Sequence, residues 1–248
     1  QEDLRPLVPM DKVSEFRNRA LSPEHPVARG MAENPETFFA HREVCNAYYD
    51  AVPAIVEKYM AAVSKITGRE YKLFSYYGAD DAERVIICMG SVTEAAREAI
   101  DYLNAKGEKV GMVSVHLYRP FSVKHLLAAV PKTCKKIAVL DRTKEPGASG
   151  EPLYLDVKDA FYNEKERPVI VGGRYGLGSA DTTPTMIISV FDNLALPEPK
   201  DHFTVGIVDD VTFASLPLEE EKALGGEGIF EAKFYGLGAD GTVGANKN

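Results

Sequence analysis

The chain has 248 residues, of which 45% are hydrophobic, so it is long enough to bury a sizeable core. Its 37 acidic residues outnumber 29 basic ones, and the resulting net charge of −8 argues against nucleic acid as a partner, because binding to phosphates needs basic side chains. Three widely separated cysteines favour a reducing compartment. With no signal-peptide pattern and no apolar run of membrane-spanning length, the expected location is the cytoplasm, away from membranes.

The first part of the chain is predicted to form an arm rather than a core. Residues 1–34 contain four prolines and are expected to be extended or looped, with one helical turn within residues 11–20. A helical pattern follows over residues 35–66, with Asn34 as its N-cap and a proline at its first position. Pro53 is expected to end or restart this helix, because proline has no backbone N–H to donate.

From about residue 80 to 210, short apolar runs alternate with amphipathic segments. Strands are expected at residues 84–89, 109–115, 136–140, 168–173 and 203–208, and helices at residues 91–106, 122–130, 152–162 and from residue 184 onward. Ser91 and Glu94 have the spacing of a capping box at the start of the first of these helices. Buried strands that alternate with helices predict a mostly parallel sheet covered on both faces, which is a three-layer α/β sandwich.

The C-terminal stretch is predicted to be a charged linker followed by the beginning of another unit. The sequence GLGADG at residues 236–241 is a GxGxxG pattern after a predicted strand, where backbone amides can approach a pyrophosphate. A single fingerprint of this kind is a weak signal, because the acidic residue expected about 20 positions later lies beyond the sequence. Both ends of the chain are expected to be cut, and no metal site is predicted, since the histidines and cysteines lack ligand spacing.

In a parallel sheet, ligands and partners meet the loops at the carboxyl ends of the strands. Arg119 and Arg142 fall in two such loops and either pair with local carboxylates or reach an anion or another domain. Four glycines surround Arg174 and either cradle an anion or form a tight turn before a helix. No nucleophile motif accompanies them, so the residues alone predict an α/β module without a complete active site.

Several long stretches carry a resemblance to a known family. They include LSPEHPVARGMAENPETFFAHRE at residues 21–43, VSVHLYRPF at 113–121, VLDRTKEPGASGEPLYLDV at 139–157, VGGRYGLGSADTTP at 171–184, GIVDDVTFASLPL at 206–218 and FYGLGADGTVGANKN at 234–248. In this order they resemble pyruvate:ferredoxin (flavodoxin) oxidoreductase, and the resemblance covers essentially the whole chain.

The resemblance implies an internal piece of a larger, cytoplasmic, homodimeric enzyme that contains thiamine diphosphate, Mg²⁺ and [4Fe-4S] clusters. Such an enzyme converts pyruvate and coenzyme A to acetyl-CoA and carbon dioxide and reduces ferredoxin or flavodoxin. Residues 1–68 would be the end of its thiamine-binding domain with a linker helix, and residues 69–217 a transketolase C-terminal-like domain. Residues 218–248 would be a linker and the truncated start of a gamma-like domain.

The same resemblance implies two groups of site residues. Candidate neighbours of coenzyme A are Gly238, Asp240, Gly241, Thr242, Asn246 and Lys247. Because the transketolase-like domain is a scaffold, the loop at residues 141–152 is expected to fix a contact with another domain or subunit, with direct ligand contact as the alternative. The candidates for this domain contact are Arg119, Asp141, Arg142, Lys144, Glu145, Glu151 and Arg174.

Several parts of the family are missing from this sequence, including the thiamine-binding GDG motif and the cysteine-rich ferredoxin-like stretches. The chain alone is therefore expected to bind no cofactor, to contain no catalytic residue and to be inactive. Two alternatives remain open: a free-standing nucleotide- or CoA-binding module, and the same segment of an oxidoreductase for another 2-oxoacid.

Overall fold

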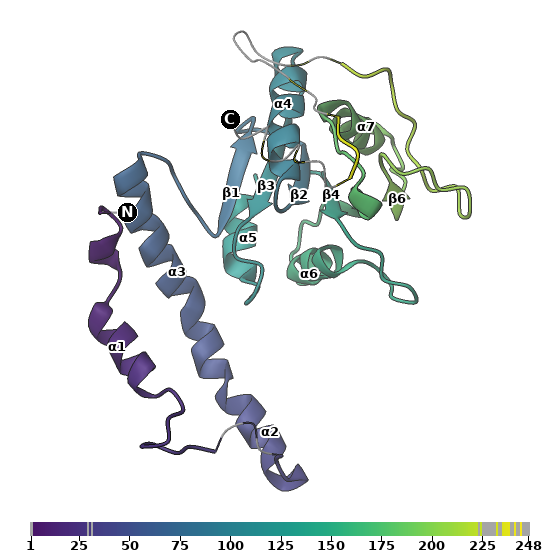
Figure 1. Ribbon diagram of the computed structural model, residues 1–248. Helices are drawn as coiled ribbons and strands as arrows, with labels where there is room; N and C mark the ends of the chain where they lie inside the picture. Colours follow the sequence, from purple (N-terminus) through teal and green to yellow (C-terminus); the bar gives the residue numbers. More distant parts are fainter. Residues whose placement is uncertain are drawn as a thin grey trace.

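The chain folds into an N-terminal helical arm and an α/β domain (Figure 1). The structure is a computed structural model that describes residues 2–28, 30, 32–222, 224, 232, 235–238, 241 and 244. Within this described part, no helix has the length and apolar composition needed to cross a bilayer.

The α/β domain is built on a six-stranded sheet with the strand order β1-β3-β2-β4-β5-β6. The strands are β1 (Phe74–Gly78), β2 (Arg84–Cys88), β3 (Val110–Val115), β4 (Lys136–Asp141), β5 (Val169–Arg174) and β6 (Phe203–Thr204). Strands β2 to β6 pair in parallel, while β1 pairs antiparallel with β3 at one edge. The predicted mostly parallel sheet is confirmed.

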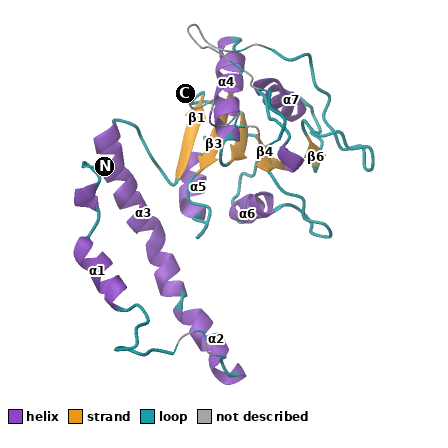
Figure 2. Ribbon diagram, viewed as in Figure 1, coloured by secondary structure: helices purple, strands orange, loops and turns teal. Residues whose placement is uncertain are grey.

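Helices cover both faces of this sheet, so the predicted three-layer architecture is also confirmed (Figure 2). One face packs against α4 (Val92–Ala105) and α7 (Pro184–Ala195), and these two helices also contact each other. The other face packs against α5 (Val123–Ala129) and α6 (Pro152–Phe161).

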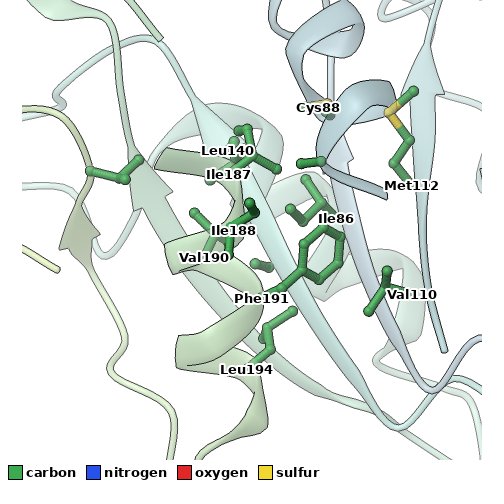
Figure 3. Packing of buried hydrophobic residues seen from close by; sticks show 14 of the residues in the cluster. Ile86, Cys88, Val110, Met112, Leu140, Ile187, Ile188, Val190, Phe191 and Leu194 are labelled. Atoms are coloured by element: carbon green, nitrogen blue, oxygen red, sulfur yellow. The ribbon is translucent and has the colours of Figure 1, made fainter. Parts of the chain in front are cut away.

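The central strands are apolar on both sides because each side faces a layer of helices. In β2, Ile86 packs into the cluster under α4 and α7, whereas its neighbour Ile87 packs into the cluster over α5 and α6. Successive side chains of a strand point to opposite faces, so a strand buried on both faces becomes a continuous apolar run. Figure 3 shows Phe191 of α7 extending toward Ile86 in the first cluster.

The N-terminal arm differs from the prediction in its helix boundaries. It contains a short 3₁₀ helix (Arg5–Leu7), then α1 (Met10–Asn18), α2 (Pro35–Val44) and α3 (Asn46–Thr67). The expectation of a single turn was wrong, because α1 has nine residues. The helical region breaks at Cys45 and not at Pro53, which lies inside α3. A proline inside a helix removes one hydrogen bond, and the remaining bonds of this 22-residue helix continue past it.

Three local predictions within and beside the α/β domain are also corrected. Strand β1 was not predicted, and β6 has two residues instead of six, because the chain turns away from the sheet at Gly206 with φ of +68°. The capping box at Ser91 is absent, since this residue has a helical backbone and its side chain makes no cap hydrogen bond. Asn34 likewise precedes α2 without a side-chain cap.

Candidate functional site

A polar cavity lies at the point where the strand order of the parallel sheet reverses. Strand β3 follows β2 in sequence but lies on one side of it, while β4 lies on the other side. Crevices at such switch points are the usual ligand sites of open parallel sheets. The cavity has a volume of about 300 Å³ and is lined by Ser91, Val92, Arg142, Tyr175, Ser179, Ala180, Asp181 and Thr182. We call it the switch-point cavity.

The walls of the switch-point cavity are tied together by hydrogen bonds between loops. The Nε of Arg142 donates to the carbonyl oxygen of Gly176 at 2.9 Å. The hydroxyl of Tyr175 donates to the carbonyl oxygen of Met89, 3.4 Å away, after β2. Burial raises the pKa of Tyr175 to about 12, so its hydroxyl remains a donor at neutral pH. The lining offers one guanidinium, one carboxylate and several hydroxyls, which can bind and orient a polar group.

Asp141, the last residue of β4, turns inward and caps a helix. Its two carboxylate oxygens accept the backbone N–H groups of Leu153 and Tyr154 of α6, each at 3.0 Å. These amides belong to the first turn of the helix, where no intrahelical acceptor exists. Asp141 is only 5% exposed. The carboxylate therefore closes the base of the loop between β4 and α6.

The tip of this loop, residues 144–149, faces outward. Lys144 and Glu145 are exposed, whereas Glu151 at the end of the loop is buried and lies 3.9 Å from the Nζ of Lys144. A Cβ atom on Gly150 would lie 2.4 Å from the ring of Tyr154, so the chain passes closely over α6 there. The loop is thus fixed at both ends and presents charge at its tip, and its contact with another domain stays a prediction.

The other two arginines of the predicted domain contact also have partners within this chain. The guanidinium of Arg119 pairs with Asp156 of α6 at 2.8 Å and lies over the ring of Tyr118, 3.9 Å from its centroid. Arg174 donates to the carbonyl oxygen of His202 at 2.5 Å. Both side chains hold neighbouring segments together at the carboxyl edge of the sheet.

The glycines around Arg174 serve packing and turning. A Cβ on Gly173 would lie 2.2 Å from the ring of Phe203, and one on Gly172 would lie 3.0 Å from the ring of Tyr154. These two glycines let side chains cross closely over the sheet. Gly176 and Gly178 have positive φ values of 62° and 66°, so they form the tight turn that the sequence left as one of two interpretations.

The predicted CoA neighbours lie in the C-terminal stretch. Gly238 and Gly241 have positive φ values of 67° and 86°. The other four candidates, Asp240, Thr242, Asn246 and Lys247, lie outside the described residues. Among the residues that the structure describes, no group of three or more His, Cys, Asp or Glu side chains could hold a metal ion.

Sequence reasoning missed the switch-point cavity and the capping role of Asp141. Tyr175 and Asp181 were not candidates, because only the strand order brings their loop beside Ser91 and Arg142. A signal for the cap existed in the proline at position 152, which marks the first turn of a helix that needs an acceptor.

The capping carboxylate predicts a pH effect. Burial raises the pKa of Asp141 above its ordinary value, and the hydrogen bonds from Leu153 and Tyr154 oppose the shift. The folded protein therefore binds the proton more readily, and this contribution to stability is present at low pH and is lost as the pH rises through the folded-state pKa. We expect the stability of the wild type relative to Asp141→Asn to increase from pH 7 to pH 4. Urea unfolding of both proteins across this range measures it, and a difference that shrinks on acidification would contradict the assignment.

Comparison with known proteins shows which family this sequence resembles. Residues 82–187 match the family model described as pyruvate:ferredoxin oxidoreductase core domain II. Over the whole chain, identity is 60% with a pyruvate-flavodoxin oxidoreductase of Enterobacter agglomerans and 54% with a pyruvate:ferredoxin oxidoreductase of Moorella thermoacetica. The chain spans 21% of the length of each of these relatives.

Among solved structures, a 2-oxoglutarate:ferredoxin oxidoreductase from Magnetococcus marinus aligns with 69% of this chain and 28% of its own chain, at 22% identity and a TM-score of 0.40. The end-to-end similarity to the sequence relatives and the match of the central region agree with each other. This chain belongs to the pyruvate:ferredoxin (flavodoxin) oxidoreductase family, and it corresponds to the segment of those proteins that contains core domain II.

Proposed function

We propose that this chain is the scaffold and docking segment of an enzyme that oxidatively decarboxylates pyruvate. Pyruvate and coenzyme A give acetyl-CoA and carbon dioxide, and the two electrons released reduce ferredoxin or flavodoxin. The observation that carries the proposal is the similarity of the whole chain to relatives named for pyruvate and for flavodoxin or ferredoxin. These names favour pyruvate over another 2-oxoacid.

The parent enzyme that we propose is cytoplasmic and homodimeric, and it holds thiamine diphosphate, Mg²⁺ and iron–sulfur clusters in its other domains. In this arrangement residues 1–68 end the thiamine-binding domain, residues 69–217 form the scaffold domain, and residues 218–248 lead into the domain that contacts coenzyme A. Within the last segment, the six residues named above as CoA neighbours would approach the coenzyme, with Lys247 as the positive charge for its phosphates.

A scaffold role is supported by how the charged residues at the carboxyl edge are used. Asp141 caps α6, Arg119 pairs with Asp156, and Arg142 holds the turn at Gly176. These contacts stiffen the β4–α6 loop at its base while its tip remains exposed. A stiff loop loses little conformational entropy when it meets a partner, which favours docking.

The test begins with the native polypeptide. We expect an antibody against residues 80–210 to isolate, under anaerobic conditions, a chain several times larger than 27.2 kDa that is brown from iron–sulfur clusters. This protein should reduce a viologen dye when pyruvate and coenzyme A are both added. The 248-residue chain expressed alone is the matched control and should show no turnover. A colourless native protein of 27.2 kDa, or turnover by the isolated chain, would overturn the proposal.

A further inference from the structure

The loop that follows β6 exposes three large apolar side chains. We call residues 206–214 the Asp209 loop. Val208 is 91% exposed, Val211 80% and Phe213 75%. In Figure 1 the yellow-green segment after β6 projects beyond the edge of the sheet. A single exposed apolar side chain is ordinary on a protein surface, but three of them within six residues form a cluster that favours an interaction site.

The carboxylate of Asp209 fixes the conformation of this loop. It accepts the backbone N–H groups of Val211 at 3.1 Å, Thr212 at 2.9 Å and Ala214 at 3.0 Å. It also accepts the hydroxyl of Thr212 at 2.5 Å. These hydrogen bonds hold the pKa of Asp209 well below its usual range. One side chain thus satisfies most of the donors at the tip of the loop.

The base of the Asp209 loop is fixed as well. The hydroxyl of Ser215 accepts the N–H of Asp209 at 2.8 Å and is 2.9 Å from the carbonyl oxygen of Ile207, to which it donates. The Nζ of Lys200 donates to the carbonyl oxygens of Phe213 at 3.3 Å and Ser215 at 3.2 Å. Ser215 and Lys200 thus hold the backbone at the base of the loop, while the side chains of Val208, Val211 and Phe213 face the solvent.

The backbone of Phe213 adds a further observation. Its φ of +56° lies in the left-handed region, which is unfavourable for a residue with a side chain. The network around Asp209 holds this conformation, and the ring of Phe213 is directed outward and not into the domain. Within the part of the chain that the structure describes, burial of the ring does not offset this unfavourable backbone, because Phe213 is 75% exposed. Burial of these Val and Phe side chains against another surface would stabilise a contact, because it removes apolar area from water.

We propose that the Asp209 loop is a preorganised anchor that inserts Val208, Val211 and Phe213 into an apolar pocket on another domain of the same polypeptide. The whole of this chain matches its relatives but spans only 21% of their length. Most of the polypeptide that could cover the loop therefore lies outside this segment. The loop also lies outside the core domain match at residues 82–187. The exposed carboxylate of Asp210 beside the apolar side chains calls for a basic residue at the rim of the pocket.

The inference rests on the proposed function in one respect, namely that this chain is part of a longer polypeptide. The experiment uses the full-length protein with photoreactive p-benzoylphenylalanine in place of Phe213, an aromatic replacement at an exposed position. The matched control carries the same residue in place of Tyr162, which is 66% exposed after α6. After irradiation, crosslinked peptides are identified by mass spectrometry.

We expect position 213 to form a crosslink within one polypeptide, to a peptide outside the 248-residue segment, at a yield several-fold above that of position 162. A doubled mass on a denaturing gel would show that a second copy covers the loop, and it would overturn the proposal. So would a crosslink confined to this segment, or a yield no higher than that of the control. Pyruvate-dependent dye reduction is measured in the same sample to separate the proposed function from the proposed anchor. An enzyme that is active but forms no crosslink would overturn the anchor and leave the proposed function standing.

A second variant tests the preorganisation. Asp209→Ala removes the acceptor of four hydrogen bonds but leaves the three apolar side chains in place. We expect the crosslink yield from position 213 to fall several-fold in this background and to stay unchanged with Asp159→Ala, an exposed aspartate of α6. An unchanged yield with Asp209→Ala would show that the network does not prepare the loop for its partner.

Discussion

Replacing Phe191 by alanine is expected to lower the free energy of unfolding by about 3–5 kcal/mol. Phe191 is fully buried between α7 and the sheet, in contact with the cluster around Ile86 (Figure 3). Truncation removes its apolar contacts and leaves a cavity that a packed helix cannot close. Because domains have a total stability of about 5–15 kcal/mol, the loss is a large share of it. Urea unfolding followed by circular dichroism measures the change.

The matched control for this experiment is Phe39→Ala in α2. Phe39 is 72% exposed, so the same chemical change should alter the stability by less than about 0.5 kcal/mol. If both variants unfolded at the same urea concentration, α7 would not pack on the sheet as described. A change in the dependence of the unfolding free energy on urea concentration would instead show that the variant no longer unfolds in the same cooperative transition.

Replacing Asp141 by alanine is expected to cost about 1–3 kcal/mol. Loss of the helix cap leaves the buried amides of Leu153 and Tyr154 without an acceptor, and an unsatisfied buried donor has a cost of this size. Hydrogen exchange at these two amides should accelerate more than exchange in β2. The control is Asp159→Ala, an exposed position on the same helix, with an expected effect within about 0.5 kcal/mol. Equal effects of the two changes would rule out the cap.

Much of the α/β domain could be predicted because its strands and helices obey simple periodicities. The run at residues 84–89 is apolar without interruption, as a strand buried on both faces should be, and β2 occupies Arg84–Cys88. The apolar stripe of α4 and that of α7 face the sheet, and their buried residues follow helical spacing. In these elements the periodicity of the sequence and the burial in the folded domain agree, so the predicted secondary structure is the one observed.

The misses occurred where local pattern and environment disagree. Strand β1 is an edge strand with mostly half-buried residues, so it lacks the apolar signature of the central strands. The apolar run at residues 203–208 predicted a long β6, but only its first three residues are buried and Val208 is almost fully exposed. Apolar character indicates that a residue needs a partner, and it does not say whether that partner is this sheet or another surface.

The candidate site could be predicted only in part. The sequence correctly indicated the carboxyl ends of the strands, where Arg142 lines the switch-point cavity. The capping bond of Asp141 joins residues that are 12 and 13 positions apart, and no local rule pairs them. The neighbours of Arg142 in the cavity come from two other connections, β2–α4 and β5–α7, and their proximity follows from the strand order alone.

The strand order also determines how far apart the two connections of the domain lie. The arm enters the domain through β1 at one edge of the sheet, and the Asp209 loop leaves from β6 at the opposite edge. With neighbouring strands about 4.8 Å apart, five spacings separate these edges by about 24 Å. A body held at two points this far apart cannot pivot freely, and a slip of about 1 Å at one end rotates it by only about 2°. Attachment through the arm at one edge and through the Asp209 loop at the other would thus make the sheet a rigid connection that fixes the angle between the parts of the polypeptide on either side.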